Sequence, residues 1–124
     1  MSRGLLVGVG GFLGSVARYW VSGAVQELSG SQFPLGTLIV NVVGSFLIGL
    51  VLAASLERGL VGAEVRLFLT VGFCGGFTTM SALSYETIAL LRDGSTAAAV
   101  GNMAGSFATC LGAVWLGDLV ARLL

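Results

Sequence analysis

Four long apolar segments alternate with short polar segments along the 124-residue chain. The apolar segments cover residues 4–25, 35–56, 65–91 and 96–117. Each is long enough for a membrane-spanning helix, which needs about 20 mainly apolar residues. The three connections are short and hold the Glu, Asp, Gly and Ser residues typical of loops. The pattern predicts an all-α membrane protein whose four transmembrane helices form one domain over residues 1–124.

The composition supports a membrane location. Hydrophobic residues make up 56% of the chain and charged residues 10%, whereas about 25% of the residues of an ordinary globular protein are charged. Glycine occurs 20 times, and small residues let membrane helices approach closely. Glycine pairs four residues apart predict such contacts, at Gly4/Gly8, Gly10/Gly14, Gly72/Gly76 and Gly101/Gly105. They favour a homo-oligomer, although for any single pair packing within one protomer is the simpler interpretation.

The residues that most enzymes use are missing. The chain has no His and no Lys, which excludes imidazole bases and His-based metal sites. Cys74 and Cys110 lie in separate apolar segments, where a free thiol behaves as a small hydrophobic side chain. The six cationic residues are arginines scattered along the chain, unlike the clustered basic surface of a nucleic-acid-binding protein. We therefore expect no enzyme, no disulfide framework and no nucleic-acid partner.

The arginines give a modest orientation signal. With four spans, both chain ends and the second connection share one side of the membrane, which then holds Arg3, Arg58, Arg66 and Arg122. The opposite side holds Arg92 and, near a helix end, Arg18. Cytoplasmic loops carry an excess of Arg, but glutamates accompany the larger group. The bias does not fix one orientation, and insertion in both orientations stays open.

The third apolar segment contains the most informative motif. Residues 71–86 read V-G-F-C-G-G-F-T-T-M-S-A-L-S-Y-E, with paired glycines and paired threonines near the middle of the span. Glycine costs about 1 kcal/mol relative to alanine inside a helix, and β-branched threonine is also unfavourable there. We therefore predict a break within residues 75–79, at its glycine pair. Backbone groups freed at membrane depth must be buried in protein or face a water-filled path. A kink made only for helix packing is the alternative.

Three polar side chains in the spans are candidates for an ion pathway, each with a structural alternative. Asn41, the one strongly polar side chain of the second span, must find partners or line a cavity. Arg18 precedes Tyr19 and Trp20, as expected for an interfacial anchor or for an electropositive vestibule. Glu86, near the end of the third span, fits an anchor at least as well as a functional group.

Hydroxyl groups after the predicted break are further candidates. Thr78, Thr79 and Ser81 suit the lining of a path for a small hydrated anion, whereas bonding to the carbonyl four residues earlier is the alternative for such side chains. In the fourth span Asn102, Ser106 and Thr109 are spaced to share one face. That face predicts either a polar lining, with Ser106 as its pore residue, or an ordinary packing seam.

Three blocks of this sequence resemble the Fluc (CrcB-type) fluoride channels of bacteria, which are small four-span proteins. The blocks are, in order, G-G-F-L-G-S-V-A-R-Y at residues 10–19, P-L-G-T-L-I-V-N-V-V-G-S-F-L-I-G at 34–49 and G-F-C-G-G-F-T-T-M-S-A-L-S-Y-E at 72–86. The second and third blocks together are specific. In length and number of spans the resemblance extends over the whole chain.

The resemblance implies a dual-topology antiparallel homodimer with two narrow fluoride pores and a structural sodium ion (Na⁺) at the dimer interface. It places the sodium ligands on the backbone carbonyls of Gly75 and Thr78 from each protomer. Carbonyl oxygens suit such a hard cation without an acidic side chain. Asn41 matches the pore-facing Asn of the family, and Arg18 matches its vestibule Arg.

The rest of the third block matches the family except at two pore positions. Thr79 and Ser81 match its hydroxyl-bearing positions, and Glu86 matches the Glu that closes the motif. The usual block continues T-T-F-S-T-F-S, with two phenylalanines that border the fluoride path, and here Met80 and Leu83 replace them. An aromatic edge carries partial positive charge that can face an anion, whereas Leu has none and Met only a polarizable thioether. Fluoride would then be handled mostly by Asn41 and these hydroxyls, or conduction would be weaker or less selective.

The sequence predicts passive fluoride export through a multi-pass protein of the bacterial cytoplasmic (inner) membrane, which protects the cell from fluoride toxicity. Fluoride, membrane lipid and a second copy of the chain are the expected partners. The sequence contains no nucleotide-binding motif and no carboxylate at the centre of a span for energy coupling. Two alternatives stand: a small dual-topology cation or multidrug exchanger, and a non-conducting homologue that folds and dimerises.

Overall fold

The computed structural model describes residues 2–124, and every regular element in that range is a helix. The elements are α1 (Arg3–Ser29), α2 (Leu35–Leu56), α3 (Ala63–Leu67), the π-helical segment η1 (Phe68–Cys74), α4 (Gly75–Phe77), α5 (Met80–Arg92) and α6 (Thr96–Arg122). The elements α3 to α5 follow one another in a single span. The structure thus has four rods long and apolar enough to cross a membrane, which confirms the all-α, four-span prediction.

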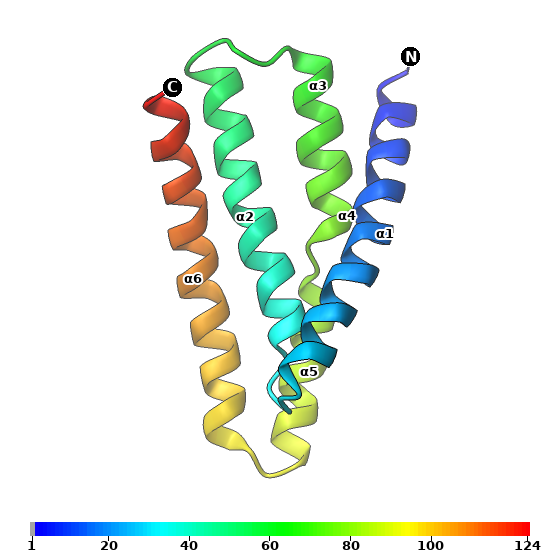
Figure 1. Cartoon of the computed structure of the whole chain (residues 1–124), viewed down its shortest axis with the longest axis vertical. Helices are drawn as coiled ribbons and strands as arrows, with labels where there is room; N and C mark the ends of the chain where they lie inside the picture. Colours follow the sequence, from blue (N-terminus) through cyan, green and yellow to red (C-terminus); the bar gives the residue numbers. More distant parts are fainter. Residues whose placement is uncertain (1) are drawn as a thin grey trace.

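The four rods run alternately up and down, and both termini lie at the same end as the α2–α3 connection (Figure 1). The second helix coincides with the predicted segment 35–56, whereas α1 and α6 continue beyond the predicted ends at residues 25 and 117. Their ends are set locally. The Ser2 hydroxyl accepts from the backbone N–H of Leu5 at the start of α1, and Gly30, with φ 59°, closes its last turn, as capping residues commonly do.

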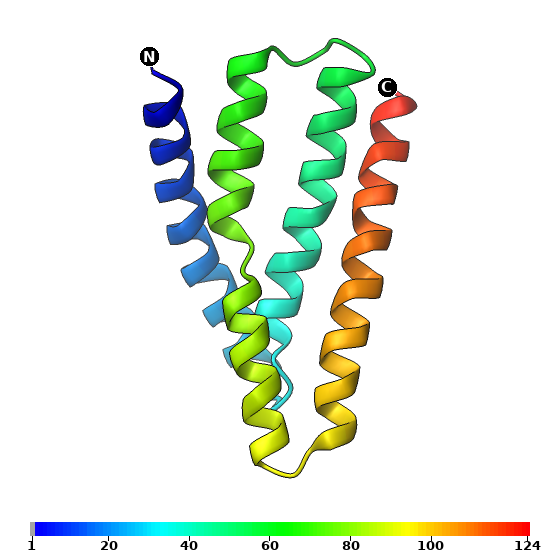
Figure 2. The same ribbon diagram turned by 180° about the vertical axis from the view of Figure 1, so that it is seen from behind.

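The third span is interrupted near its middle (Figure 2). Helical geometry ends at Phe77, and Thr78 (φ −94°, ψ 157°) and Thr79 (φ −152°, ψ 114°) are extended before α5 begins at Met80. The interruption lies within the predicted range 75–79. The expectation that its glycine pair forms the break is wrong, because Gly75 and Gly76 are both part of the helical turn α4.

The glycines of this region instead let α1 pack directly on the third span. A Cβ on Gly10 would lie 2.6 Å from the carbonyl oxygen of Phe68, and one on Gly76 would lie 2.5 Å from that of Gly11. Side chains there would push the helices apart. By contrast, no neighbouring atom lies within 4 Å of a Cβ placed on Gly4, Gly8, Gly101 or Gly105. The predicted pairs 10/14 and 72/76 therefore pack within the protomer, and the other two pairs do not.

The helices α2 and α6 approach each other in the same way. A Cβ on Gly49 would meet the carbonyl oxygen of Val114, and one on Gly117 would meet that of Phe46. The buried core between these helices is small and consists of Ala53, Ala54 and Ala121. Most large apolar side chains of the described chain are exposed, among them Phe12, Leu111 and Trp115. A surface of this kind suits contact with lipid or with a second protein rather than with water.

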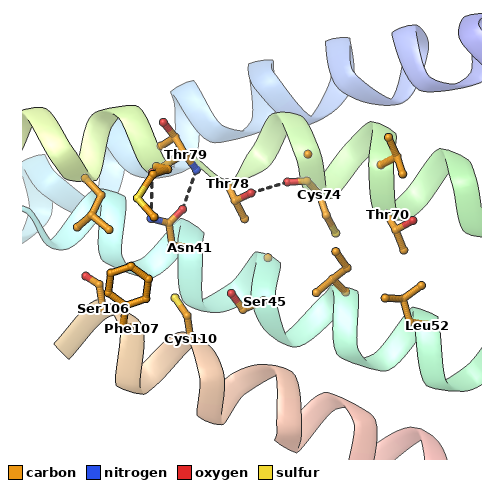
Figure 3. Close-up of a pocket in the computed structure, with 16 residues that line it drawn as sticks. Asn41, Ser45, Leu52, Thr70, Cys74, Thr78, Thr79, Ser106, Phe107 and Cys110 are labelled. Carbon is orange, nitrogen blue, oxygen red and sulfur yellow. Dashed lines mark hydrogen bonds between the residues drawn. The ribbon is translucent and has the colours of Figure 1, made fainter. Parts of the chain in front are cut away.

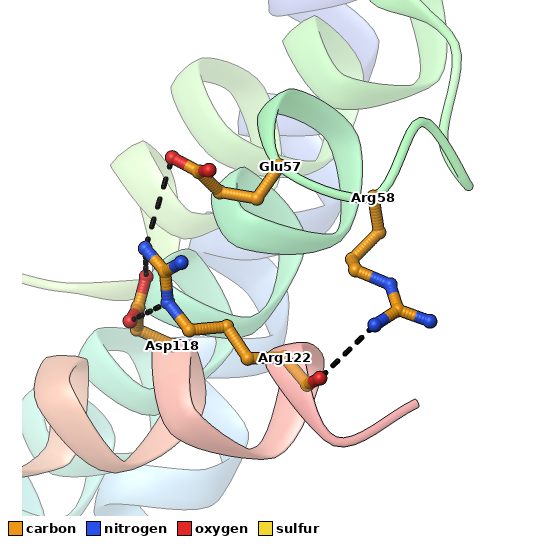
Figure 4. A network of polar contacts seen from close by, with 4 residues as sticks. All are labelled: Glu57, Arg58, Asp118 and Arg122. Atoms are coloured by element: carbon orange, nitrogen blue, oxygen red, sulfur yellow. Dashed lines mark hydrogen bonds and ion pairs between the residues drawn. The ribbon is translucent and has the colours of Figure 1, made fainter.

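Polar contacts join the ends of α2 and α6 at the end of the bundle that carries both termini (Figure 4). The Nε of Arg122 donates to Asp118 Oδ2 at 2.7 Å, and its Nη2 lies 3.7 Å from Glu57 Oε1. The guanidinium of Arg58 donates to the carbonyl oxygens of Arg122 and Leu124. Exposed pairs of this kind contribute little stability. The carboxylates do partly neutralise Arg122, one of the four arginines on which the orientation signal rests.

Candidate ion pathway

A cavity of about 620 Å³ lies between α2, the third span and α6 (Figure 3). Most of its wall is apolar, and the polar groups in it belong to Asn41, Ser45, Thr70, Thr78, Thr79 and Ser106. None of the described residues that line it is charged. The wall thus offers amide and hydroxyl groups without a fixed charge. Such groups can replace part of the hydration shell of an ion without holding the ion tightly.

Asn41 connects the wall of this cavity to the break in the third span. The backbone N–H of Thr79 donates to Asn41 Oδ1 at 2.8 Å, and Asn41 Nδ2 donates to the carbonyl oxygen of Thr79 at 3.2 Å. These backbone groups lie where the helix is interrupted, and buried groups of this kind need a partner. An amide nitrogen carries two N–H donors, so one of them stays available for a group in the cavity.

The two threonines of the break have different roles. The hydroxyl of Thr78 donates to the carbonyl oxygen of Cys74 at 2.9 Å. Cys74 lies four residues earlier, so Thr78 follows the alternative given above, in which a hydroxyl bonds to its own helix. The hydroxyl of Thr79 caps α5 by accepting from the backbone N–H of Ala82, and it lies 3.2 Å from the hydroxyl of Ser81. Thr79 therefore both lines the cavity and starts the second half of the span.

Arg18 reaches the break from α1. Its Nε donates to the carbonyl oxygen of Gly76 at 2.9 Å, near the end of the first half of the span, where carbonyls lack intrahelical partners. A cation is also favoured at the C-terminal end of a helix by the helix dipole. Arg18 lines neither the cavity of Asn41 nor the second cavity, at Glu86. Within the protomer, Arg18 therefore stabilises the break through this hydrogen bond. Its role in a vestibule stays a prediction.

Glu86 lies in that second cavity, which has a volume of about 390 Å³. The hydroxyl of Thr37 donates to Glu86 Oε1 at 2.5 Å. Gln26, Gly36 and Pro34 line the same cavity near the connection between α1 and α2. The carboxylate is therefore held by Thr37 of α2, which lies one helical turn before Asn41 on that helix.

The three polar residues of α6 separate in the structure. The Nδ2 of Asn102 donates to the hydroxyl of Thr87 at 3.0 Å, in a buried contact between α5 and α6. Ser106 lines the main cavity. Thr109 is exposed and donates to the carbonyl oxygen of Gly105 at 2.6 Å. The expected face thus divides into a packing contact, a cavity residue and a side chain bonded to its own helix.

A family model described as CrcB-like protein, Camphor Resistance (CrcB), matches residues 5–118, which include most of all four spans. The chain belongs to the CrcB family. Relatives within it are similar over all or nearly all of their length. The "Fluoride-specific ion channel FluC" of Geobacter sulfurreducens is 50% identical over 124 residues, or 100% of both chains. Proteins of the same name from Opitutus terrae and Chlorobaculum tepidum are 52% and 51% identical and cover 98% and 99% of this chain and 93% and 97% of their own.

The family that the sequence blocks predicted is therefore confirmed, and the structure locates the residues that the CrcB resemblance singled out. Most of them line the one cavity: Asn41, Gly75, Thr78, Thr79, Met80, Leu83 and Ser106. Met80 is 56% exposed in its wall, whereas Leu83 is 5% exposed. Ser81 is exposed beside Thr79, and Arg18 and Glu86 lie elsewhere.

Three residues of this CrcB protein were missed by the sequence analysis. Thr37 holds Glu86, and its position four residues before Asn41, on the same helix face, is a signal that could have revealed it. Phe107 is the one aromatic side chain among the described residues of the cavity wall. Cys110 lines the same wall, one turn after Ser106. The position of Cys110 four residues after Ser106 is likewise a signal that could have revealed it, whereas Phe107 could not be placed from sequence.

Proposed function

We propose that this CrcB-family chain forms a fluoride-selective channel through which fluoride leaves the cell passively, across the cytoplasmic membrane. The observation that carries the proposal is an uncharged cavity lined by amide and hydroxyl groups at the break of a transmembrane span. Relatives about 50% identical over the whole chain bear the name fluoride-specific ion channel. Export of this kind protects the cell from fluoride.

The groups in the cavity wall suit fluoride. A pore selective for a small, strongly hydrated anion has to replace its water with donors at fixed positions. The amide of Asn41 and the hydroxyl of Thr79 are fixed by their hydrogen bonds at the break. Ser106 contributes a further hydroxyl to the wall of the same cavity, from α6. These three side chains are the proposed fluoride ligands, and Ser81, Met80 and Leu83 border them.

The exchanger alternative is less well supported. A proton-coupled exchanger uses a titrating acidic residue in the transport path. The described residues of the main cavity include none, and Glu86 is bonded to Thr37 in the second cavity. A path whose described wall contains no charged or acidic residue is suited to passive flow of an ion down its gradient.

The functional unit in this proposal is an antiparallel homodimer that inserts with dual topology. The helix α6 leaves Gly101 and Gly105 without contacts in the protomer, and small residues on a membrane helix let another helix approach closely. Its large apolar side chains Leu111 and Trp115 are exposed. A second protomer would cover part of this surface, and membrane lipid would cover the rest. The weak arginine bias is compatible with both orientations.

A structural sodium ion at the interface of that dimer completes the proposal, with the backbone carbonyls of Gly75 and Thr78 as its ligands. Both residues line the cavity, and Thr78 is extended at the end of the first half-helix. The described residues contain no group of three or more His, Cys, Asp or Glu that could hold a metal. Carbonyl oxygens suit a hard cation, and a bound cation would offset the negative end of the half-helix dipole.

Flux measurements on purified protein separate the three candidate functions. Liposomes loaded with potassium fluoride are treated with a potassium ionophore, and fluoride release is followed with a fluoride electrode. The channel predicts release, whereas proton-coupled cation uptake without fluoride release would support the exchanger. A Met80→Phe, Leu83→Phe double variant tests the third candidate. If this variant and the original chain both release no fluoride and both fail to rescue fluoride-sensitive cells, the protein is a non-conducting homologue.

A further inference from the structure

The thiol of Cys110 lies in the wall of the main cavity, opposite the break of the third span. Cys110 is half-buried, whereas Cys74, the other thiol of that wall, is 3% exposed. Figure 3 shows the Cys110 side chain directed from α6 toward the space between α6 and α2. Both thiols are free. A reagent inside the cavity would therefore meet Cys110 before Cys74.

A second, independent observation is a buried hydroxyl without a partner in the same part of the wall. Ser106 lies one helical turn before Cys110, on the same face of α6. The residue is 2% exposed, and its Oγ has no hydrogen-bond partner among the described residues. A buried hydroxyl without a partner costs about 1–3 kcal/mol, so a polar group that reached this hydroxyl from the cavity would be stabilised there. Cys110 faces the same polar space.

We propose that Cys110 is a modification site within the ion path, where a small thiol-reactive electrophile bonds to Sγ and blocks the flow of ions. The proposal rests on the proposed function of the cavity as a path for fluoride. Thiolate is the reactive form of cysteine, and it forms where the side chain can reach water. A hydrated path would bring water and a small reagent to this thiol within the membrane.

Methyl methanethiosulfonate is a suitable probe because it is small and uncharged. The Cys110 thiolate attacks the methylthio sulfur of the reagent and forms a new S–S bond. The bond between that sulfur and the sulfonyl sulfur breaks, and methanesulfinate leaves with its electron pair. The thiol proton goes to water, so atoms and charge balance. A thiol reductant such as dithiothreitol reverses the modification by exchange.

The test compares fluoride release from liposomes before and after treatment, in the full-length protein, in Cys110→Ser and in Cys74→Ser. Each protein is compared with its own untreated sample, so unequal basal rates do not matter. We expect treatment to lower release by about tenfold or more in the unsubstituted protein and in Cys74→Ser, because a bulkier side chain obstructs a narrow pore. Release from Cys110→Ser should not change, and dithiothreitol should restore the two blocked proteins. Peptide mass spectrometry should find one methylthio group, on Cys110.

Several results would overturn the proposal. Absence of the methylthio group from Cys110 in intact liposomes would mean that the thiol does not face a hydrated space. Modification of Cys110 with unchanged fluoride release would place it outside the path, and a block that persists in Cys110→Ser would assign it to another group. A protein that releases no fluoride even before treatment would refute both the block and the proposed channel function. Labelling of Cys110 in that protein would still show that the thiol is accessible.

Discussion

The side-chain amide of Asn41 makes both of its observed hydrogen bonds to one residue, Thr79, through that residue's backbone N–H and carbonyl groups. Thr79 begins the second half of the interrupted span. The Asn41 amide, which belongs to α2, thus supplies Thr79 with the hydrogen bonds that the backbone of a continuous third helix would supply. Asn41 therefore both lines the proposed path and supports the helix break.

The first prediction concerns the charge at this position. In Asn41→Asp the amide donor is replaced by a carboxylate oxygen, which repels both the carbonyl oxygen of Thr79 and an anion in the cavity. Two like charges within a few ångström of each other in a protein interior repel by several kcal/mol. We expect fluoride release from liposomes to fall by about tenfold or more.

A matched control separates the local effect from the added charge. Ser29→Asp introduces the same charge at the exposed end of α1, and Ser29 lines neither of the two cavities. Release from this variant should match that of the original protein. Unchanged release from Asn41→Asp would remove Asn41 from the ion path.

The second prediction concerns the hydrogen bond between Arg18 and Gly76. In Arg18→Gln the positive charge is lost, and the shorter side chain no longer brings a donor to the carbonyl oxygen of Gly76. Loss of a partner for a partly buried group costs about 1–3 kcal/mol, so the protein should unfold at a lower temperature in detergent. Arg92→Gln removes an exposed arginine at the end of α5 and should lower the unfolding temperature less, because only a weak interaction with the helix dipole is lost. Equal unfolding temperatures for both variants would show that the bond does not support the break.

The third prediction compares two glycines of α1. A Cβ on Gly14 would meet the carbonyl oxygen of Phe73, whereas a Cβ on Gly23 would have no neighbouring atom within 4 Å. Gly14→Ala should therefore separate α1 from the third span and destabilise the protein by about 1–3 kcal/mol. Gly23→Ala should be neutral or stabilising by up to about 1 kcal/mol, since alanine favours helix. Thermal unfolding checks both, and similar effects of the two changes would contradict the observed packing.

The fourth prediction concerns the aromatic ring in the cavity wall. The edge of Phe107 carries partial positive charge, and neither Met80 nor Leu83 can supply it. Phe107→Leu should reduce fluoride release by about twofold to tenfold, the range expected for loss of one aromatic contact. Phe12→Leu, which changes an exposed ring on α1, serves as the control. If both variants release fluoride at the original rate, the ring has no part in conduction.

The sequence predicted the break of the third span to within five residues, but it could not identify the residues that form it. Helix propensity points to Gly75 and Gly76, because glycine is unfavourable in a helix. In the structure Gly76 is helical and serves the close approach of α1. The interruption falls at Thr78 and Thr79, where Asn41 from another helix supplies the missing hydrogen bonds. Such tertiary support leaves no local signal in the third span.

Other features show the same limit. The π-helical segment Phe68–Cys74 has no proline or other marker in its sequence, and it lies where α1 packs most closely on the third span. The bond between Thr37 and Glu86 joins residues 49 positions apart. Polar side chains within apolar spans could thus be recognised as candidates from sequence. Which of them share one cavity depended on how the helices pack.

The most direct test of the account is the release of fluoride compared with chloride from liposomes that contain the purified protein. Potassium fluoride or potassium chloride is sealed inside, a potassium ionophore removes the electrical barrier, and anion-selective electrodes follow each ion. The account predicts rapid fluoride release and chloride release no faster than from protein-free liposomes. Equal release of the two anions, or no release of fluoride, would contradict it.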